Sequence, residues 1–240
     1  MKLAELLAKR HMRDQLTDPG LIEKVTPDYT IGCKRILPSN RWYRTLSKPN
    51  VELVTDAITE VRGNRIVTAD GRAREVDAIV LGTGFHVTDI PAAHRIRGRD
   101  GVLLDDLWHG SPRAHLGSTV AGFPNLFFLL GPNTGLGHSS MVYMIESQVE
   151  HVMAALRHMR EHGAQTIEVR PEVQERYNAA LERQLEGTVW NTGCASWYLD
   201  RTGRNSTAWP DWTWRFRRRV AKLDPAEYVL DAPVRVPVPA

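Results

Sequence analysis

The sequence lacks the features that mark membrane proteins and secreted, disulfide-stabilised proteins. Only two cysteines, Cys33 and Cys194, occur in 240 residues, which argues against a disulfide framework and fits a reducing cytosol. No apolar run approaches the roughly 20 residues that a membrane-spanning helix needs. Residues 1–10 mix charged residues with leucine, as an amphipathic helix does and a signal peptide does not. We therefore expect a cytoplasmic protein without a membrane span.

A complete dinucleotide-binding glycine motif is also absent. The nearest match to G-x-G-x-x-G is Gly135-x-Gly137-x-x-Ser140, in which serine replaces the third glycine. The composition excludes little, because 42% hydrophobic and 25% charged residues are ordinary for a soluble globular protein. The length suffices for one large domain or two small ones.

The mild net charge of +3 has one visible concentration, in residues 214–219, where arginines alternate with aromatic side chains. Such a pattern is compatible with nucleic-acid binding. A solvated C-terminal helix or a docking surface is the preferred interpretation, because the other basic residues are spread among acidic ones. We expect no nucleic-acid partner.

Two short apolar runs end at glycine, and they predict the centre of the fold. Residues 77–81 and 126–130 have the continuous hydrophobicity of buried parallel strands. The carboxyl ends of such strands are where nucleotide cofactors lie in open α/β sheets. We therefore predict an α/β fold with a partial Rossmann-like sheet, with candidate cofactor loops at residues 82–84 and 131–140.

Hydrophobic spacing and turn residues predict the other elements. Gly63-Asn64 suits a turn with positive φ inside a small antiparallel meander, and Asp70-Gly71 suits the next turn. Gly163 marks the end of a long amphipathic helix. The segment after residue 185 is expected to be Trp-rich and irregular. The predicted helices cover residues 1–24, 139–162 and 171–185, and the predicted strands cover residues 51–54, 58–61, 65–68 and 166–169.

Residues 131–140 combine a strand end, a glycine loop and a helix start. Backbone N–H groups at a helix N-terminus meet anionic or electron-rich ligands in this arrangement. A flavin ring bound here would have negative charge on its reduced form stabilised by the helix. Ser139 also suits the simpler role of an N-cap.

Two competing motifs are weaker. Residues 137–141 half match the nucleophile elbow of α/β-hydrolases, but Met141 replaces the second glycine and a loop separates the strand from the serine. His158-Met159-Arg160-Glu161-His162 matches the H-x-x-E-H string of inverted zinc proteases. Gly163 breaks the helix directly afterwards, and the sequence singles out no downstream carboxylate as a third ligand. We therefore predict neither a hydrolase nor a metal site.

Four stretches together carry a family resemblance: residues 32–38, 77–85, 121–148 and 196–205. They resemble the Baeyer-Villiger branch of the flavin-dependent monooxygenases, over roughly residues 20–215. The resemblance implies FAD and NADPH as cofactors, and a ketone and O2 as substrates. The implied reaction converts the ketone into an ester or lactone through a C4a-peroxyflavin. The related N- or S-oxygenating flavin monooxygenases are a less favoured alternative.

The resemblance also assigns roles to residues. Lys34 would contact the 2′-phosphate of NADPH, and Arg35 would be the catalytic residue that lies over the flavin. A compact ammonium suits a phosphate, and a permanently charged guanidinium suits a developing anion. Without the family resemblance, Lys34 and Arg35 would be interpreted as a basic pair in a surface loop. Trp197 would lie against the nicotinamide nucleotide, whereas a packing role is its simpler reading. The other implied cofactor-binding residues are Gly82, Thr83, Gly84, Asn133, Gly135, Leu136, Gly137, Ser139 and Ser140, and the implied substrate-facing residues are Leu136 and Met141.

The sequence departs from the family in lacking both of its glycine motifs and the fingerprint between them. We therefore interpret the chain as the C-terminal part of such an enzyme, inactive alone or dependent on a separate chain that supplies the N-terminal Rossmann half. The alternative is a non-catalytic binding or assembly module, or a truncated relic. The expected domains are residues 1–48 (end of the NADPH domain and linker), 49–165 (returning half of the FAD domain) and 166–240 (helical segment covering the cofactor site).

Overall fold

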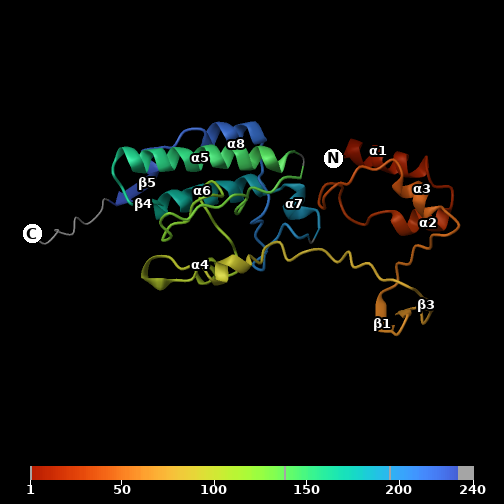
Figure 1. Ribbon diagram of the computed structural model, residues 1–240. Helices are drawn as coiled ribbons and strands as arrows, with labels where there is room; N and C mark the ends of the chain where they lie inside the picture. Colours follow the sequence, from red (N-terminus) through yellow and green to blue (C-terminus); the bar gives the residue numbers. More distant parts are fainter. Residues whose placement is uncertain (1, 138, 195, 232–240) are drawn as a thin grey trace, which may run out of the picture. The chain divides into compact units, whose positions relative to one another are not determined.

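The computed structural model describes residues 2–137, 139–194 and 196–231 (Figure 1). The chain forms two compact units: unit 1 comprises Met1–Ile31 and Ile36–Phe85, and unit 2 comprises Gly32–Arg35 and His86–Ala240. No helix among the described residues has the length and apolarity to cross a membrane. The domain bounds expected from the sequence stay a prediction.

Unit 1 begins with three helices, α1 (Lys2–Arg13), α2 (Pro19–Val25) and α3 (Trp42–Leu46). The sequence predicted one helix over residues 1–24, and the structure divides it in two. Asp18 causes the break, because its side chain accepts a hydrogen bond from the Gly20 amide at 2.9 Å and caps α2. Pro19 then occupies the first turn of α2, where its missing N–H costs nothing.

The antiparallel meander in unit 1 is confirmed. Its strands are β1 (Ile58–Arg62), β2 (Arg65–Thr68) and β3 (Ala73–Glu75), in the order β1-β2-β3. Gly63 and Gly71 adopt φ of 59° and 79° in the two connecting turns, as the turn residues predicted. The strand predicted over residues 51–54 is wrong, because these residues join no sheet.

The two parallel strands predicted from the sequence do not form. Residues 77–81 and 126–130 have no strand geometry, and both sheets among the described residues are antiparallel. Val80 and Leu81 are 93% and 79% exposed. A parallel strand is buried only when neighbouring strands and helices cover it, and no described element of unit 1 covers this run. The fold is therefore mixed α/β with small antiparallel sheets, and the predicted Rossmann-like sheet is absent from the described residues.

Unit 2 is built on the long helix α5 (Met141–Glu161), beside which α8 (Thr213–Val220) lies (Figure 1). Strand β4 (Thr166–Val169) and helix α6 (Pro171–Leu185) follow as predicted. The segment expected to be irregular instead contains ordered elements, including a strand that pairs with β4. The remaining elements of unit 2 are η1 (Pro91–His94), η2 (Arg99–Gly101), α4 (Leu104–Trp108), α7 (Val189–Thr192), η3 (Pro225–Glu227) and β5 (Tyr228–Asp231).

Both ends of α5 follow helix-terminus rules. Ser140, and not Ser139 as predicted, is the N-cap, and its hydroxyl accepts a hydrogen bond from the Tyr143 amide at 3.4 Å. Gly163 has φ of 60° just beyond the helix, which confirms its predicted role as the stop signal.

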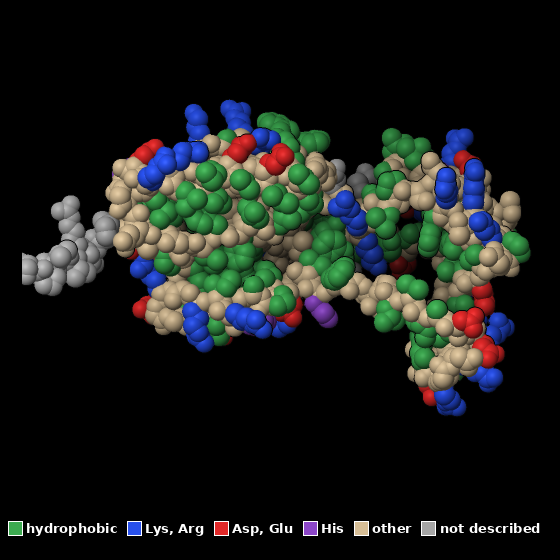
Figure 2. All heavy atoms as spheres, viewed as in Figure 1, with side chains coloured by type: hydrophobic (Ala, Val, Ile, Leu, Met, Phe, Trp, Pro, Cys, Tyr) green, Lys and Arg blue, Asp and Glu red, His purple; other side chains and the backbone are tan. Residues whose placement is uncertain are grey.

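The main core of unit 2 fills the space between α5, α6, α8 and the loop that precedes α5. Each of its large side chains contributes roughly 1.5–3 kcal/mol through burial. Hydrophobic side chains also gather on the viewed face of this unit in Figure 2, and on α5 Val142, Val149, Met153 and Leu156 stay exposed. The core cluster consists of Leu116, Leu136, Met144, Leu181, Trp209, Phe216 and Val220.

A disulfide joins Cys33 to Cys194, with 6.0 Å between the Cα atoms. The expectation that the two cysteines form no disulfide was wrong. They lie 161 residues apart in sequence, so no local pattern indicates that the fold brings them together. The bond attaches the segment Gly32–Arg35 to the loop that follows α7.

A buried histidine connects α5 to the C-terminal part of unit 2. The His151 Nδ1–H donates to the Val220 carbonyl at 3.2 Å, and the Tyr228 hydroxyl lies 2.9 Å from Nε2 and donates to it. Burial lowers the pKa of His151 to about 4, so the ring is neutral at pH 7. Nearby, the hydrogen bond from His115 lowers the pKa of Glu227 to about 2.

Reducing the disulfide should destabilise the protein. By the loop-entropy argument, a bond that closes a loop of this length contributes about 2–5 kcal/mol to the free energy of unfolding. We expect dithiothreitol to lower the melting temperature of the wild-type chain and to leave that of the Cys33→Ser/Cys194→Ser variant unchanged. Two titratable thiols in the unreduced native chain would contradict this prediction.

His151 should make stability depend on pH between about 6.5 and 4. An unfolded histidine binds a proton below about pH 6.5, whereas the folded ring stays neutral down to about pH 4. Its contribution is fully present above pH 6.5 and is lost as the pH falls, by about 3 kcal/mol in total. We expect a shallower pH dependence of the free energy of unfolding in His151→Gln than in the exposed control His86→Gln. Equal slopes in these two variants would refute the assignment.

Candidate functional site

A cavity of about 280 Å³ lies within unit 2. It brings together five residues predicted from the sequence, although they are spread over more than 160 positions: Arg35, Gly135, Leu136, Met141 and Trp197. The other lining residues are Val87, Thr88, Ile90, Pro112, Leu130, Gly131, Pro132, Thr134, Ser206 and Thr207.

The loop of residues 131–137 forms one wall of the cavity, and backbone hydrogen bonds hold it against residues 205–209. The Gly135 amide donates to the Thr207 carbonyl at 2.7 Å, and the Trp209 amide donates to the Gly135 carbonyl at 2.8 Å. The approach is so close that a Cβ at position 135 would lie 2.7 Å from the Thr207 oxygen. Glycine is therefore required here by packing, whichever ligand the loop serves.

The buried side chain of Asn133 stabilises this contact through hydrogen bonds. It is 1% exposed and has φ of 56°. Its Nδ2 donates to the Asn205 carbonyl at 2.8 Å and to the Ala208 carbonyl at 3.2 Å. Its Oδ1 accepts from Arg204 at 3.3 Å. The side chain is thus occupied within the protein, and its predicted cofactor contact remains a prediction.

Arg204 supports the same contact, although no role was predicted for it from the sequence. Its guanidinium donates to Ser111 Oγ at 2.7 Å and to the Pro112 carbonyl, and lies 3.7 Å from Asp200. Burial lowers the pKa of Arg204 to about 10, so the group stays charged at neutral pH. The resemblance included Gly203-Arg204-Asn205, but only the tertiary structure reveals which loops the arginine joins.

Arg35 reaches the cavity from a segment with no regular secondary structure. Its Nη1 donates to the Leu136 carbonyl at 2.5 Å, and the disulfide at Cys33 holds the chain two residues earlier. An arginine fixed at one N–H and otherwise exposed keeps donors available for a ligand. Lys34 is exposed and is not among the lining residues.

Trp197 forms part of the wall and is 44% exposed. Its ring centroid lies 4.2 Å from that of Tyr198, at an interplanar angle of 35°. Tyr198 is buried and contacts Trp190 with its ring. The indole thus rests on a fixed aromatic support while part of it remains open for stacking.

The other predicted site residues do not line the cavity. The Ser139 hydroxyl lies 3.5 Å from Thr213, and Ser140 is used as the helix cap. Gly137 lies beside Trp190. Gly82, Thr83 and Gly84 belong to unit 1, where they are exposed.

The donor set fits part of a flavin. Leu136 and Met141 provide apolar walls, while Ser206 is 4% exposed and its hydroxyl has no partner among the described residues. A buried unpaired hydroxyl in a cavity is a natural hydrogen-bonding point for a ligand. Small-molecule pockets usually measure about 300–1,000 Å³, so a cavity of about 280 Å³ suits a ring system better than a whole dinucleotide.

The hydrolase alternative gains no support. Within the described part of the chain, neither Ser139 nor Ser140 is hydrogen-bonded to a histidine. His138, which the predicted motif includes, lies outside the described residues.

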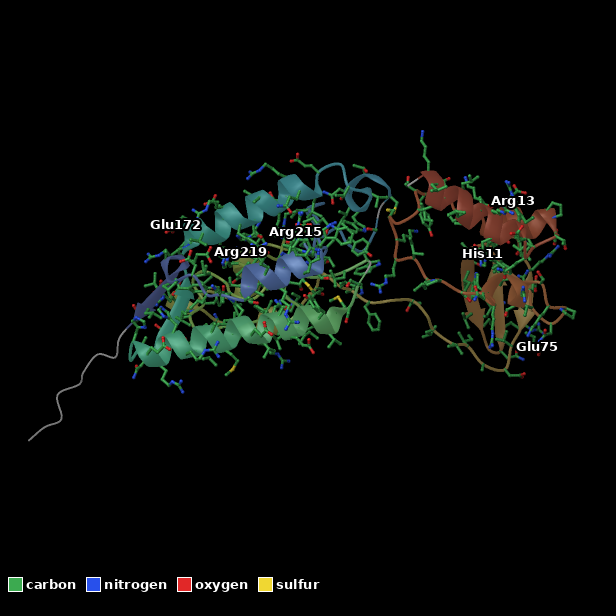
Figure 3. All side chains as sticks on the ribbon, turned by 90° about the horizontal axis from the view of Figure 1, so that it is seen from above. His11, Arg13, Glu75, Glu172, Arg215 and Arg219 are labelled. Carbon is green, nitrogen blue, oxygen red and sulfur yellow. A yellow bond between two sulfur atoms is a disulfide. The ribbon has the colours of Figure 1, made fainter. Side chains whose placement is uncertain are left out.

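Three of the four arginines of α8 are paired with carboxylates. Arg215 lies 3.1 Å from Asp211, and Arg217 lies 2.6 Å from Glu150. Arg219 forms an ion pair with Glu227. Figure 3 labels Arg215 and Arg219 on this helix. These pairs favour a solvated helix over a phosphate-binding surface.

The curated proteins that match nearly the whole chain include two Baeyer-Villiger monooxygenases. A Baeyer-Villiger monooxygenase from Pseudomonas aeruginosa is 53% identical over 232 residues, covering 96% of this chain and 44% of that protein. A Baeyer-Villiger monooxygenase from Streptomyces coelicolor is 49% identical over 238 residues, covering 98% of this chain and 46% of that protein. No family model matches the chain.

Solved structures of monooxygenases also match nearly the whole chain. Cyclohexanone monooxygenase from Rhodococcus sp. Phi1 bound to NADP+ matches with a TM-score of 0.83 and 28% identity, over 97% of this chain and 45% of that one. Oxidized steroid monooxygenase bound to NADP matches with a TM-score of 0.84 and 29% identity, over 97% and 46%. The chain spans somewhat less than half the length of these relatives and is homologous, over nearly all of its own length, to the Baeyer-Villiger monooxygenase family.

Proposed function

We propose that this chain contributes the C-terminal part of a FAD- and NADPH-dependent monooxygenase that converts a ketone and O2 into an ester or lactone. The observation that carries the proposal is the cavity in unit 2, which gathers Arg35, Leu136, Met141 and Trp197. The family resemblance of the sequence assigns each of these residues to the site of such an enzyme. The 53% identity to a Baeyer-Villiger monooxygenase supports the same reading.

Arg35 is the proposed catalytic residue. Bound FAD, once reduced by NADPH, would supply the oxygen-transfer chemistry. The chain's part is to hold a permanent positive charge where negative charge develops, and a guanidinium does this without titrating. The hydrogen bond to the Leu136 carbonyl at 2.5 Å orients the group toward the cavity.

The remaining proposed contacts follow from position and chemistry. Trp197 offers its open face to a planar nicotinamide, and Lys34 offers an ammonium to a phosphate. The Ser206 hydroxyl and the backbone of residues 131–137 would orient the flavin ring. Gly82, Thr83 and Gly84 stay proposed FAD contacts from unit 1.

The alternative proposal is a non-catalytic binding or assembly module. It draws on the cavity's volume of about 280 Å³, which is small for a dinucleotide, and on the absence of G-x-G-x-x-G from the sequence. Oxygenation of an amine or sulfide in place of a ketone is a further variant of the first proposal. A separate chain that supplies the remaining length of the relatives would make the two proposals compatible.

A chimera separates these proposals. The matched 232 residues of the Pseudomonas aeruginosa relative are replaced by this chain, and the product is desalted after incubation with FAD. We expect retained flavin absorption and NADPH-dependent ester formation from a ketone, whereas the chain alone should lose the flavin on desalting. If the folded chimera retains no flavin absorption while the intact Pseudomonas aeruginosa relative does, the enzyme proposal is refuted and the assembly module is favoured.

Substitution of Arg35 in the active chimera tests its role. Removing one electrostatic stabiliser of a developing anion costs about 10²–10³-fold in kcat. We expect Arg35→Ala to lose ester formation to this extent while it retains FAD, and Arg35→Lys to recover only part of the rate. Arg183→Ala, an exposed arginine of α6 outside the cavity, is the control. Ester formation at the parent rate by Arg35→Ala would contradict the assignment.

A further inference from the structure

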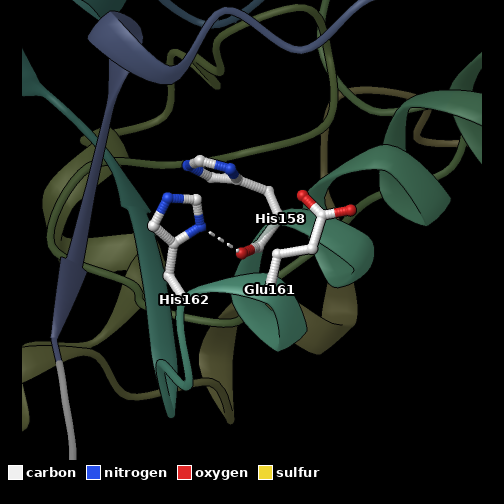
Figure 4. Close-up of side chains that lie close together, drawn as sticks. All are labelled: His158, Glu161 and His162. Atoms are coloured by element: carbon white, nitrogen blue, oxygen red, sulfur yellow. Dashed lines mark hydrogen bonds between the residues drawn. The ribbon is translucent and has the colours of Figure 1, made fainter.

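The last turn of α5 and its C-cap residue His162 carry three side chains of types that can bind metal ions, and the proposed function does not use them. His158, Glu161 and His162 each offer one ligand atom, and these atoms lie within 4.8 Å of one another (Figure 4). Helical positions i, i+3 and i+4 share one face, which explains why the three side chains meet. His158 is half-buried and the other two are exposed.

The two histidine rings lie close together, and one of them makes a hydrogen bond of the kind that metal-binding histidines make. The two ring centroids lie 4.3 Å apart. The His162 Nδ1–H donates to the His158 carbonyl at 2.9 Å, so in the neutral ring the lone pair is on Nε2. A metal-binding histidine characteristically donates its second N–H to a carbonyl or carboxylate, which fixes the tautomer and the ring orientation.

The distances require only side-chain adjustment. Zinc binds imidazole nitrogen at about 2.0–2.1 Å, so tetrahedral ligand atoms lie about 3.3 Å apart. One possible ligand atom of each residue lies within 4.8 Å of the others, and the exposed side chains of Glu161 and His162 can rotate to bring their ligand atoms closer. The C-terminal end of a helix also carries partial negative charge, which favours a cation.

Although the sequence predicted no metal site here, we propose from this geometry that His158, Glu161 and His162 form a binding site for a first-row divalent transition metal, with Zn²⁺ as its representative occupant. Two imidazoles and a carboxylate are ligands that Zn²⁺ accepts, with water completing the shell. In this site Glu161 is a ligand, so the cluster does not reproduce the glutamate base of the zinc proteases. None of the three residues lines the cavity that contains Arg35, and the metal site is independent of the proposed function.

Calorimetric titration of the full chain with ZnCl2 in a non-chelating buffer tests the site. We expect one Zn²⁺ per chain and, for His158→Gln or His162→Gln, a loss in affinity of at least about tenfold. Glu161→Gln should also weaken binding, because an amide is a poorer ligand than a carboxylate. His86→Gln removes an exposed histidine elsewhere in unit 2 and should bind as the wild type does.

X-ray absorption of the zinc-loaded wild type gives a reading that does not depend on the folding of any variant. Two imidazoles and additional oxygen ligands in the first shell are expected. The proposal is overturned if binding is not saturable, if His86→Gln weakens it as much as His162→Gln does, or if the spectrum shows fewer than two imidazoles. Wild-type affinity in a folded Glu161→Gln variant would overturn the three-ligand site.

Discussion

The cavity of unit 2 depends on the contact between residues 131–137 and residues 205–209. The two segments are pinned by backbone hydrogen bonds at Gly135 and by the buried amide of Asn133. A buried amide that finds all of its partners stabilises one loop arrangement, whereas an unpaired one would cost about 1–3 kcal/mol. Because Leu136 from this loop also enters the main core, packing and polar pairing select the same conformation. The packing of the core therefore helps to determine the shape of the cavity.

Local patterns predicted local structure well. The hairpin around Gly63, strand β4, helix α6 and the end of α5 at Gly163 all follow from spacing and turn residues within about twenty positions. The same reasoning failed for residues 77–81 and 126–130. A continuous apolar run states only that a segment tends to be buried. Whether it becomes a strand depends on neighbours that pair with it, and those neighbours are not encoded in the run.

The residues of the candidate site likewise divide into those that the sequence predicted and those that it did not. Family resemblance located Arg35, Gly135, Leu136, Met141 and Trp197, all of which line one cavity. It assigned no role to Arg204, whose hydrogen-bond partner Ser111 is far away in the sequence. It also assigned none to Ser206, whose buried hydroxyl has no partner among the described residues. The pairing of Cys33 with Cys194 is the extreme case. Two cysteines in 240 residues carry no compositional signal of a disulfide, and only the tertiary fold places them in contact.

The means by which Arg35 is held bears on how it could act. No helix or strand positions it: the disulfide at Cys33 and the hydrogen bond to the Leu136 carbonyl are its described anchors. The covalent anchor limits where the segment can go, while the hydrogen bond selects one orientation and can be exchanged at low cost, since its net contribution is about 1 kcal/mol. A guanidinium held in this way keeps its charge at the cavity but can turn its donors from a carbonyl of the protein to a ligand. In the proposed enzyme, Arg35 would therefore keep its positive charge at the cavity while its hydrogen-bond partners change.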